Sequence, residues 1–194
     1  MTIAPCKPLF LTKFDVAERQ LNQAIALFFD RGDPVSIHTL AEATAQVLYD
    51  LKEKYGVTSI FRDNDRIRDE YKNVWFATLF KSRNFFKHAD RDGDVVHEFK
   101  EEFNHFSLSD AVNMYLSAKK AWTPETLLFL VWFAAMYPNI VKEGTDFSAL
   151  VECFRSGPDA IPINDLSFFS QVLSSLRSGK QAIPGVVLEL GLPE

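Results

Sequence analysis

Apolar residues recur at steps of three and four along most of the first 140 residues, and this spacing constrains the fold more than any other feature. Between positions 12 and 28 the repeating set is Phe14, Ala17, Leu21, Ala24, Ile25 and Phe28. Such steps place side chains on one face of an α-helix. Alternating β-branched runs bounded by turns, which would predict strands, do not occur in the sequence. The sequence therefore predicts an all-α fold.

Start and stop signals divide this pattern into separate helices. The expected helices run over about residues 12–28, 37–55, 74–88, 107–116, 124–137, 147–154 and 164–176. The expected N-terminal caps are Thr12, Ser107 or Ser109, Thr123 followed by Pro124, and Asn164. The first two helices are joined by a short turn and predict a helical hairpin. The charged stretch 62–73 is either a loop or the solvated start of the third helix.

The organisation of the chain changes after residue 140. Residues 1–140 are expected to form a helical bundle, whereas residues 141–194 are richer in Gly, Pro and Ser and carry a weaker helical pattern. We expect this second part to be a C-terminal helical extension that packs on the same domain. The tail from Gly179 has no clear pattern.

The composition limits the functional and cellular classes to which this chain can belong. The chain has 194 residues and a net charge of −5, which argues against a protein that coats nucleic acid without specificity. The longest apolar run, Leu127–Tyr137, is too short for the ~20 residues that cross a bilayer, and no signal peptide is evident. Cys6 and Cys153 have no CxxC partner or neighbouring base. We expect a cytoplasmic protein without membrane contact, metal or cofactor.

One short segment concentrates groups that could bind a phosphate and move a proton. Lys81-Ser82-Arg83-Asn84-Phe85-Phe86-Lys87-His88 sets a guanidinium, a carboxamide and an imidazole within six residues. From Lys81 to Arg91 there are four cations against one acid, in a chain that is acidic overall. The segment is therefore the leading candidate for a functional site.

The pattern Arg83-Asn84, three residues, then His88, late on a helix that follows a helical hairpin, resembles the signature of the HEPN superfamily of small all-helical domains. The resemblance covers roughly residues 10–140. It implies an up-down helical bundle, with the extra C-terminal helices as an addition. It also implies a homodimer that cleaves or binds RNA in a toxin–antitoxin, defence or stress setting, with an antitoxin or regulatory protein as a further partner.

The same resemblance implies a metal-independent endoribonuclease in which three residues are catalytic. His88 would move a proton at the ribose 2′-hydroxyl or the leaving oxygen, Arg83 would stabilise the charge on the phosphorane, and Asn84 would orient the reacting groups. The cations Lys81, Lys87 and Arg91 would bind flanking phosphates. On an ideal helix Arg83 points about 140° away from His88. A dimer that places two copies of the motif side by side is therefore expected.

Several alternatives remain open at this stage. A non-catalytic module could use the motif to bind a nucleotide or a partner, and cations at a helix C-terminus also act as simple caps. Asp90-Arg91-Asp92-Gly93-Asp94 with Glu101 matches four ligand positions of a calcium loop, but Val95 stands where Gly is needed for the sharp turn. Calcium binding is therefore not favoured.

The remaining histidines and the aromatic residues have structural interpretations. We expect His38 to be a hydrogen-bonded structural histidine rather than a second catalytic group. His97 and His105, with Glu98, Glu101 and Glu102 between them, favour a solvated acidic face over a metal site. The aromatic set Trp75, Phe76, Phe80, Phe85 and Phe86 could stack on bases, but helical spacing favours core or dimer interface.

Overall fold

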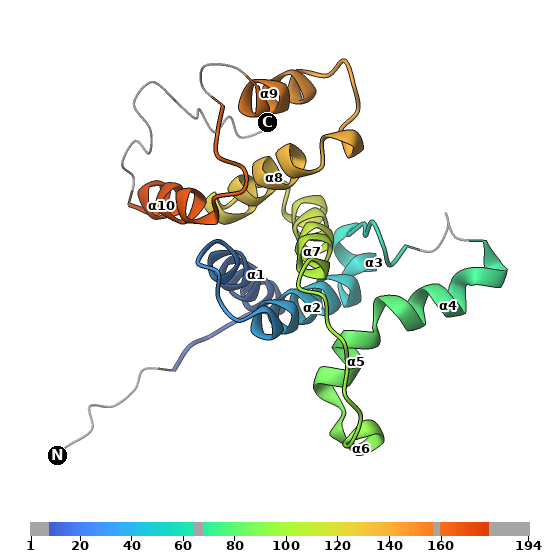
Figure 1. Ribbon diagram of the computed structural model, residues 1–194. Coiled ribbons are helices and arrows are strands. Elements are labelled where there is room, and N and C mark those ends of the chain that lie inside the picture. Colours follow the sequence, from blue (N-terminus) through green and yellow to red (C-terminus); the bar gives the residue numbers. More distant parts are fainter. Residues whose placement is uncertain (1–7, 64–67, 157–159, 179–194) are drawn as a thin grey trace.

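The computed structural model describes residues 8–63, 68–156 and 160–178, and this part of the chain is helical with no strand (Figure 1). The elements are α1 (Lys13–Phe29), α2 (Pro34–Asp50), α3 (Lys52–Tyr55), α4 (Asp69–Leu79), α5 (Lys81–Lys87), α6 (Ala89–Asp92), α7 (Phe103–Lys119), α8 (Pro124–Met136), the 3₁₀ turn η2 (Pro138–Ile140), α9 (Asp146–Arg155) and α10 (Leu166–Arg177). The predicted all-α fold is confirmed.

Local capping explains where the first helices begin and end. Thr12 caps α1 through a capping box with Asp15, as the sequence predicts. Asp33 caps α2 by accepting a hydrogen bond from the Ser36 backbone N–H at 2.7 Å. The short helix α3 ends at Gly56, whose φ of 65° lies in the left-handed region that glycine adopts without strain.

Two predicted starts are wrong. Helix α7 begins at Phe103, so Ser107 and Ser109 lie inside it. The first turn lacks a side-chain cap, but Asn104 is buried there and donates to the Pro34 carbonyl at 2.9 Å. This tertiary contact explains why α7 begins before Ser107 and Ser109, where the local sequence signals a helix start. The last helix is capped by Asp165 and not by Asn164.

The predicted third helix is two helices. The backbone breaks at Phe80, with φ −96° and ψ 4°, between α4 and α5. The charged stretch before them is divided as well, because Arg62 precedes α4 in a loop and Asp69 opens the helix. The chain changes direction at this break, so that α5 packs on α2 while α4 projects away from the bundle (Figure 1).

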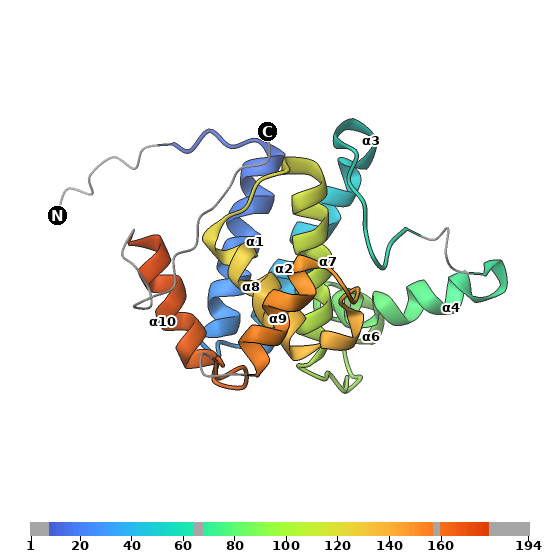
Figure 2. The ribbon, with the colours of Figure 1, turned by 90° about the horizontal axis from the view of Figure 1, so that it is seen from above.

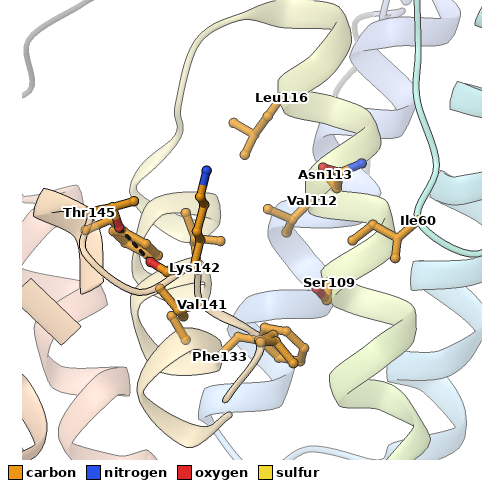
Figure 3. A pocket seen from close by; sticks show the side chains of 13 residues that line it. Ile60, Ser109, Val112, Asn113, Leu116, Phe133, Val141, Lys142 and Thr145 are labelled. Carbon is orange, nitrogen blue, oxygen red and sulfur yellow. Dashed lines mark hydrogen bonds between the residues drawn. The ribbon is translucent and has the colours of Figure 1, made fainter. Parts of the chain in front are cut away.

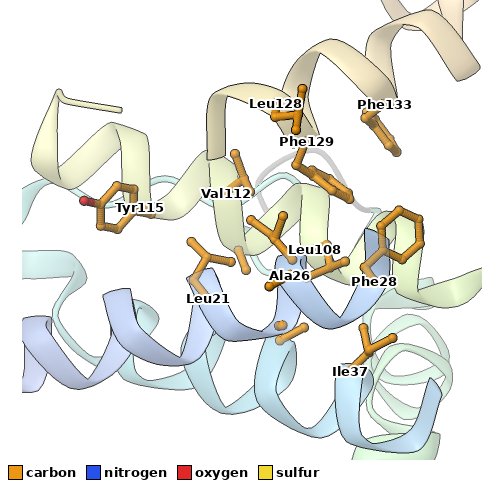
Figure 4. Packing of buried hydrophobic residues seen from close by; sticks show 14 of the residues in the cluster. Leu21, Ala26, Phe28, Ile37, Leu108, Val112, Tyr115, Leu128, Phe129 and Phe133 are labelled. Carbon is orange, nitrogen blue, oxygen red and sulfur yellow. The ribbon is translucent and has the colours of Figure 1, made fainter. Parts of the chain in front are cut away.

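The core lies between α1, α2, α7 and α8, with α10 packed on α1 and α8 (Figure 2). Its fully buried large side chains include Leu21, Ile25, Phe29, Leu48, Leu108, Met114, Tyr115, Phe129, Trp132 and Phe169. Figure 4 shows the side chains of the four helices meeting in one layer. Helix α9 packs on the outer side of α8. The division of the chain at residue 140 remains a prediction.

Helices α4 and α5 contain no buried residue, unlike the helices of the core. None of the helices that the structure describes is long and apolar enough to span a membrane. Cys153 is exposed and carries no disulfide, whereas Cys6 and the tail from Gly179 lie outside the described residues.

Candidate functional site

The motif predicted from the sequence occupies α5 and the residue that follows it. Helix α5 ends at Lys87, and the His88 backbone N–H donates to the Asn84 carbonyl at 3.1 Å. His88 itself has φ −127° and ψ 81°, which is not helical. The ideal-helix angle between Arg83 and His88 therefore does not describe the true direction of the imidazole.

Arg83 is half-buried and fixed against α2. Its Nη1 donates to Gln46 Oε1 at 2.8 Å, and its Nη2 lies 3.5 Å from Asn84 Oδ1. Its guanidinium carbon is 4.1 Å from the centre of the Phe80 ring. Burial lowers the pKa of Arg83, but an arginine stays charged at any physiological pH. The side chain is thus a positioned cation.

The other described side chains with a predicted catalytic or phosphate-binding role face solvent. Asn84, His88, Lys81 and Lys87 are exposed. Arg91 belongs to α6, but its side chain lies outside the described part of the structure. The contacts of Arg83 go to its own helix and to α2, and none of those found among the described residues joins it to His88. The structure leaves the pair apart within one chain.

A second arginine, Arg62, touches the same Phe80 ring, with its guanidinium carbon 5.0 Å from the ring centre. Arg62 is only 3% exposed, although it belongs to the charged stretch 62–73, which the sequence predicts to be either a loop or a solvated helix start. Its Nη2 donates to Glu42 Oε2 at 2.8 Å, and its Nε lies 3.6 Å from Asp110 Oδ2. A buried charge of this kind requires such partners.

Asp110 holds the loop that carries Arg62 into the interior. Its carboxylate accepts from the Ser59 hydroxyl at 2.8 Å and from the Ile60 backbone N–H at 2.7 Å. The Ser59 hydroxyl oxygen in turn accepts from the Arg62 backbone N–H at 2.8 Å. Burial raises the pKa of Asp110, although these hydrogen bonds and Arg62 act in the opposite direction.

His38 lies one helical turn before Glu42 on α2 and is 3% exposed. Its Nδ1 is 3.1 Å from Asn104 Oδ1, so the structural role predicted for it is present. The rings of Phe86 and Phe99 meet it edge-on, at centre distances of 5.6 Å and 5.1 Å. Burial lowers the pKa of His38, which favours the neutral imidazole.

A cavity of about 200 Å³ adjoins this polar cluster, between α2, α4, α7 and the loop before α4. It is lined by His38, Glu42, Phe61, Arg62, Trp75, Thr78, Leu79, Ser82, Phe103, Phe106, Ser107 and Asp110. Ser82 belongs to the motif helix. The short helix that carries the motif therefore also contributes to the wall of the cavity.

The other predicted features fall into different surroundings. His105 bonds the Tyr137 hydroxyl at 2.7 Å and packs on Trp132, so the expected solvated face is wrong there. His97 contacts Ser82 Oγ at 2.9 Å and lies against the Phe85 ring. The five aromatic residues from Trp75 to Phe86 are all half-buried. They lie on α4, on α5 and at the break between these helices, outside the buried core.

The acidic segment after the motif forms α6 and the residues that follow it. Ala89–Asp92 is helical, and Gly93 also has helical dihedral angles, with φ −56° and ψ −26°. Among the residues that the structure describes, no three His, Cys, Asp or Glu side chains gather in a way that could hold a metal ion.

A larger cavity, of about 350 Å³, lies between α7, α8 and the segment that leads into α9 (Figure 3). Its lining is mostly aliphatic and aromatic, with Lys142 at one edge. The described ion pairs and the buried carboxylates all lie elsewhere. This cavity offers apolar volume with few groups that could orient a ligand.

Sequence reasoning missed Arg62, Glu42 and Asp110. One signal was present, because Glu42 and Asp110 stand among apolar residues on the inward faces of their helices. A carboxylate at such a position needs a buried cation. Nothing local marks Arg62 among its charged neighbours as that cation.

No family model, no curated protein and no solved structure matches this chain, so a function can be inferred only from its own residues.

Proposed function

We propose that this chain is an RNA-binding protein that cleaves RNA without a metal ion, as a homodimer, through Arg83, Asn84 and His88. The observation that carries the proposal is the contrast within the motif. Arg83 is held by Gln46 and Phe80, while Asn84 and His88 are exposed. A fixed cation and an accessible imidazole are the two kinds of group that phosphodiester cleavage requires.

The roles follow from the chemistry of each group. The His88 imidazole takes the proton from the ribose 2′-hydroxyl or returns one to the leaving 5′-oxygen. The Arg83 guanidinium stabilises the charge on the phosphorane, and its contact with Asn84 Oδ1 at 3.5 Å links the two residues. Lys81 and Lys87, both exposed, bind phosphates on either side.

A second chain completes this site. Since Arg83 is anchored on α2 and His88 lies beyond the end of α5, one copy offers the two groups at separate points. Two copies packed through their α5 helices place the arginine of one beside the histidine of the other. The resemblance to HEPN domains supports this arrangement and a toxin–antitoxin, defence or stress setting.

The test is cleavage of a mixed-sequence RNA in EDTA by the full chain, with light scattering to determine the oligomeric state. We expect cleavage by a dimer, loss of cleavage in His88→Ala, and a loss of roughly 10²-fold or more in Arg83→Lys, where the charge stays but the planar fork is lost. Arg155→Ala, an exposed cation on α9, is the matched control and keeps full activity. His88→Ala changes the free energy of unfolding by less than about 0.5 kcal/mol because the side chain is exposed.

If neither the wild type nor the variants cleave the RNA, the proposed ribonuclease activity is contradicted. A non-catalytic binding module is the second candidate, favoured by the engagement of Arg83 within its own chain. In that case RNA or nucleotide binding persists, weakens in Lys81→Ala and Lys87→Ala, and is insensitive to His88→Ala.

A further inference from the structure

Three buried polar atoms of Arg62 and His38, beside the smaller cavity, have no hydrogen-bond partner among the described residues. Nε of Arg62 faces the Asp110 carboxylate at 3.6 Å, which leaves Nη1 of Arg62 and Nε2 of His38 without a polar contact. Both side chains line the cavity of about 200 Å³, and each is only 3% exposed. Buried polar atoms of proteins are almost always paired, so a site with two unpaired ones is suited to a ligand that pairs both.

The hydrogen-bonding character of the two atoms is opposite. Asn104 Nδ2 donates to the Pro34 carbonyl, so Asn104 Oδ1 is the oxygen that faces His38. His38 Nδ1 therefore donates, and in the neutral ring Nε2 is an acceptor. Arg62 Nη1 can only donate. These two atoms thus offer one donor and one acceptor.

Glu42 brings these two groups to the same wall. It follows His38 by four residues on α2, and side chains at this spacing are neighbours on one face of a helix. Its Oε2 accepts from Arg62 Nη2 at 2.8 Å. Glu42 thus joins the helical turn that carries His38 to the guanidinium of Arg62.

Charge and shape narrow the class of ligand. Glu42 and Asp110 already offset the charge of Arg62, so the site does not call for an anion such as phosphate. The remaining walls include Phe61 and Trp75, whose rings suit a flat partner. The volume exceeds the ~150 Å³ that accommodates benzene in an engineered protein cavity.

We propose that this cavity binds a neutral planar ring whose carbonyl adjoins a ring N–H, the edge that guanine and uracil carry. The carbonyl accepts from Arg62 Nη1, and the ring N–H donates to His38 Nε2. With the ring in the same orientation, adenine and cytosine set an amino group and an unprotonated ring nitrogen at these places, which opposes donor to donor and acceptor to acceptor. This inference rests on the proposed RNA function. In an RNA chain, the base enters the cavity when it is not stacked on its neighbours.

The first experiment measures binding of guanosine, uridine, adenosine and cytidine to the full chain by calorimetry and thermal unfolding. We expect guanosine or uridine to bind at least about tenfold more tightly than adenosine and cytidine, since mismatched buried groups penalise the wrong edge. Equal binding of all four, or tighter binding of adenosine or cytidine, overturns the proposal.

Two variants test whether the nucleoside binds in this cavity. Ser107→Leu fills the space, and His38→Phe keeps a ring but removes the acceptor; both are expected to lose the guanosine or uridine preference. His105→Phe is the matched control, because His105 lies outside this cavity, and it retains the preference. Unchanged binding in a folded Ser107→Leu variant contradicts the assignment.

Oligonucleotides separate this inference from the proposed function. Tighter binding of U- or G-containing RNA than of poly(A), lost in Ser107→Leu, supports both. Binding of free guanosine or uridine without any RNA binding supports the cavity and contradicts the RNA function. RNA binding with no base preference and no nucleoside binding contradicts the cavity and leaves the RNA function standing.

Discussion

Two regions of the molecule differ in how deeply they bury their side chains, although both are made of helices with apolar residues at helical spacing. One is the bundle of α1, α2, α7 and α8, and the other is the arm of α4 and α5. The bundle buries a continuous set of apolar side chains, several of them with no exposure at all. The arm contains no buried residue and is held by half-buried aromatic rings. Arg83 and Asn84 lie in the arm and His88 directly follows it, so the candidate chemistry lies in a region without fully buried side chains.

The junction between the two regions is polar. Arg62 on the bundle side and Arg83 on the arm side contact one ring, Phe80, at 5.0 Å and 4.1 Å. Arg62 is offset by two buried carboxylates, whereas Arg83 bonds an uncharged amide on Gln46. The buried arginine is thus a fixed part of the fold, and the half-buried one keeps a charge to offer to a ligand.

The largest expected effect on the free energy of unfolding compares a fully buried position of the bundle with a half-buried position of the arm. Phe129→Ala empties a fully buried position in the bundle and is expected to lower the free energy of unfolding by about 3–5 kcal/mol. Phe76→Ala on α4 removes the same side chain from a half-buried position and is expected to cost about 1 kcal/mol. Urea unfolding followed by circular dichroism measures both. Equal losses would mean that the arm is as tightly packed as the bundle.

The next effect concerns the polar junction. Arg62→Ala leaves Glu42 and Asp110 buried without their cation, so we expect a loss of about 3–4 kcal/mol in the same assay. Arg68→Ala, which removes an exposed partner of Glu70, is the control and changes stability by less than about 1 kcal/mol. A small effect at Arg62 would show that the carboxylates are solvated.

The smallest effect is a pH dependence. Burial lowers the folded-state pKa of His38 below its ordinary value of 6.5, so the unfolded chain binds a proton more readily. Stability is then fully present above about pH 6.5 and falls as the pH drops below it, by up to about 1.4 kcal/mol per pH unit. His38→Phe removes this contribution.

His105 provides the comparison, because burial lowers its pKa as well. Unfolding measured between pH 7 and pH 5 should show that His38→Phe and His105→Phe each flatten the wild-type slope, and that the double variant flattens it further. An unchanged slope in His38→Phe would mean that this imidazole is accessible to solvent.

Local rules predicted most of the helices. The capping box at Thr12 and the Thr123-Pro124 start hold in the structure, because caps are satisfied by residues three positions away. The starts assigned to Ser107 and Asn164 failed. At Ser107 a buried contact of Asn104 outweighed the local signal, and at Asn164 the neighbouring Asp165 caps the helix.

The site was accessible to sequence reasoning only in part. The motif at Arg83, Asn84 and His88 was visible as a cluster of residue types; the structure exposes Asn84 and His88 and half-buries Arg83, and the role of the motif stays a prediction. The angle inferred between Arg83 and His88 did not apply, because α5 ends before His88. The cavity could not be foreseen, since its walls come from segments up to about seventy residues apart.

The sequence by itself determined that this chain is helical, where most of its helices lie, and which short segment concentrates charge and an imidazole. Periodicity and capping depend on residues within a few positions, so they can be read directly. Only the tertiary structure decided that the chain breaks at Phe80 and that Arg62 enters the interior. Burying that cation requires Glu42 and Asp110 from two other helices, and such a long-range balance of charge and desolvation has no local signature.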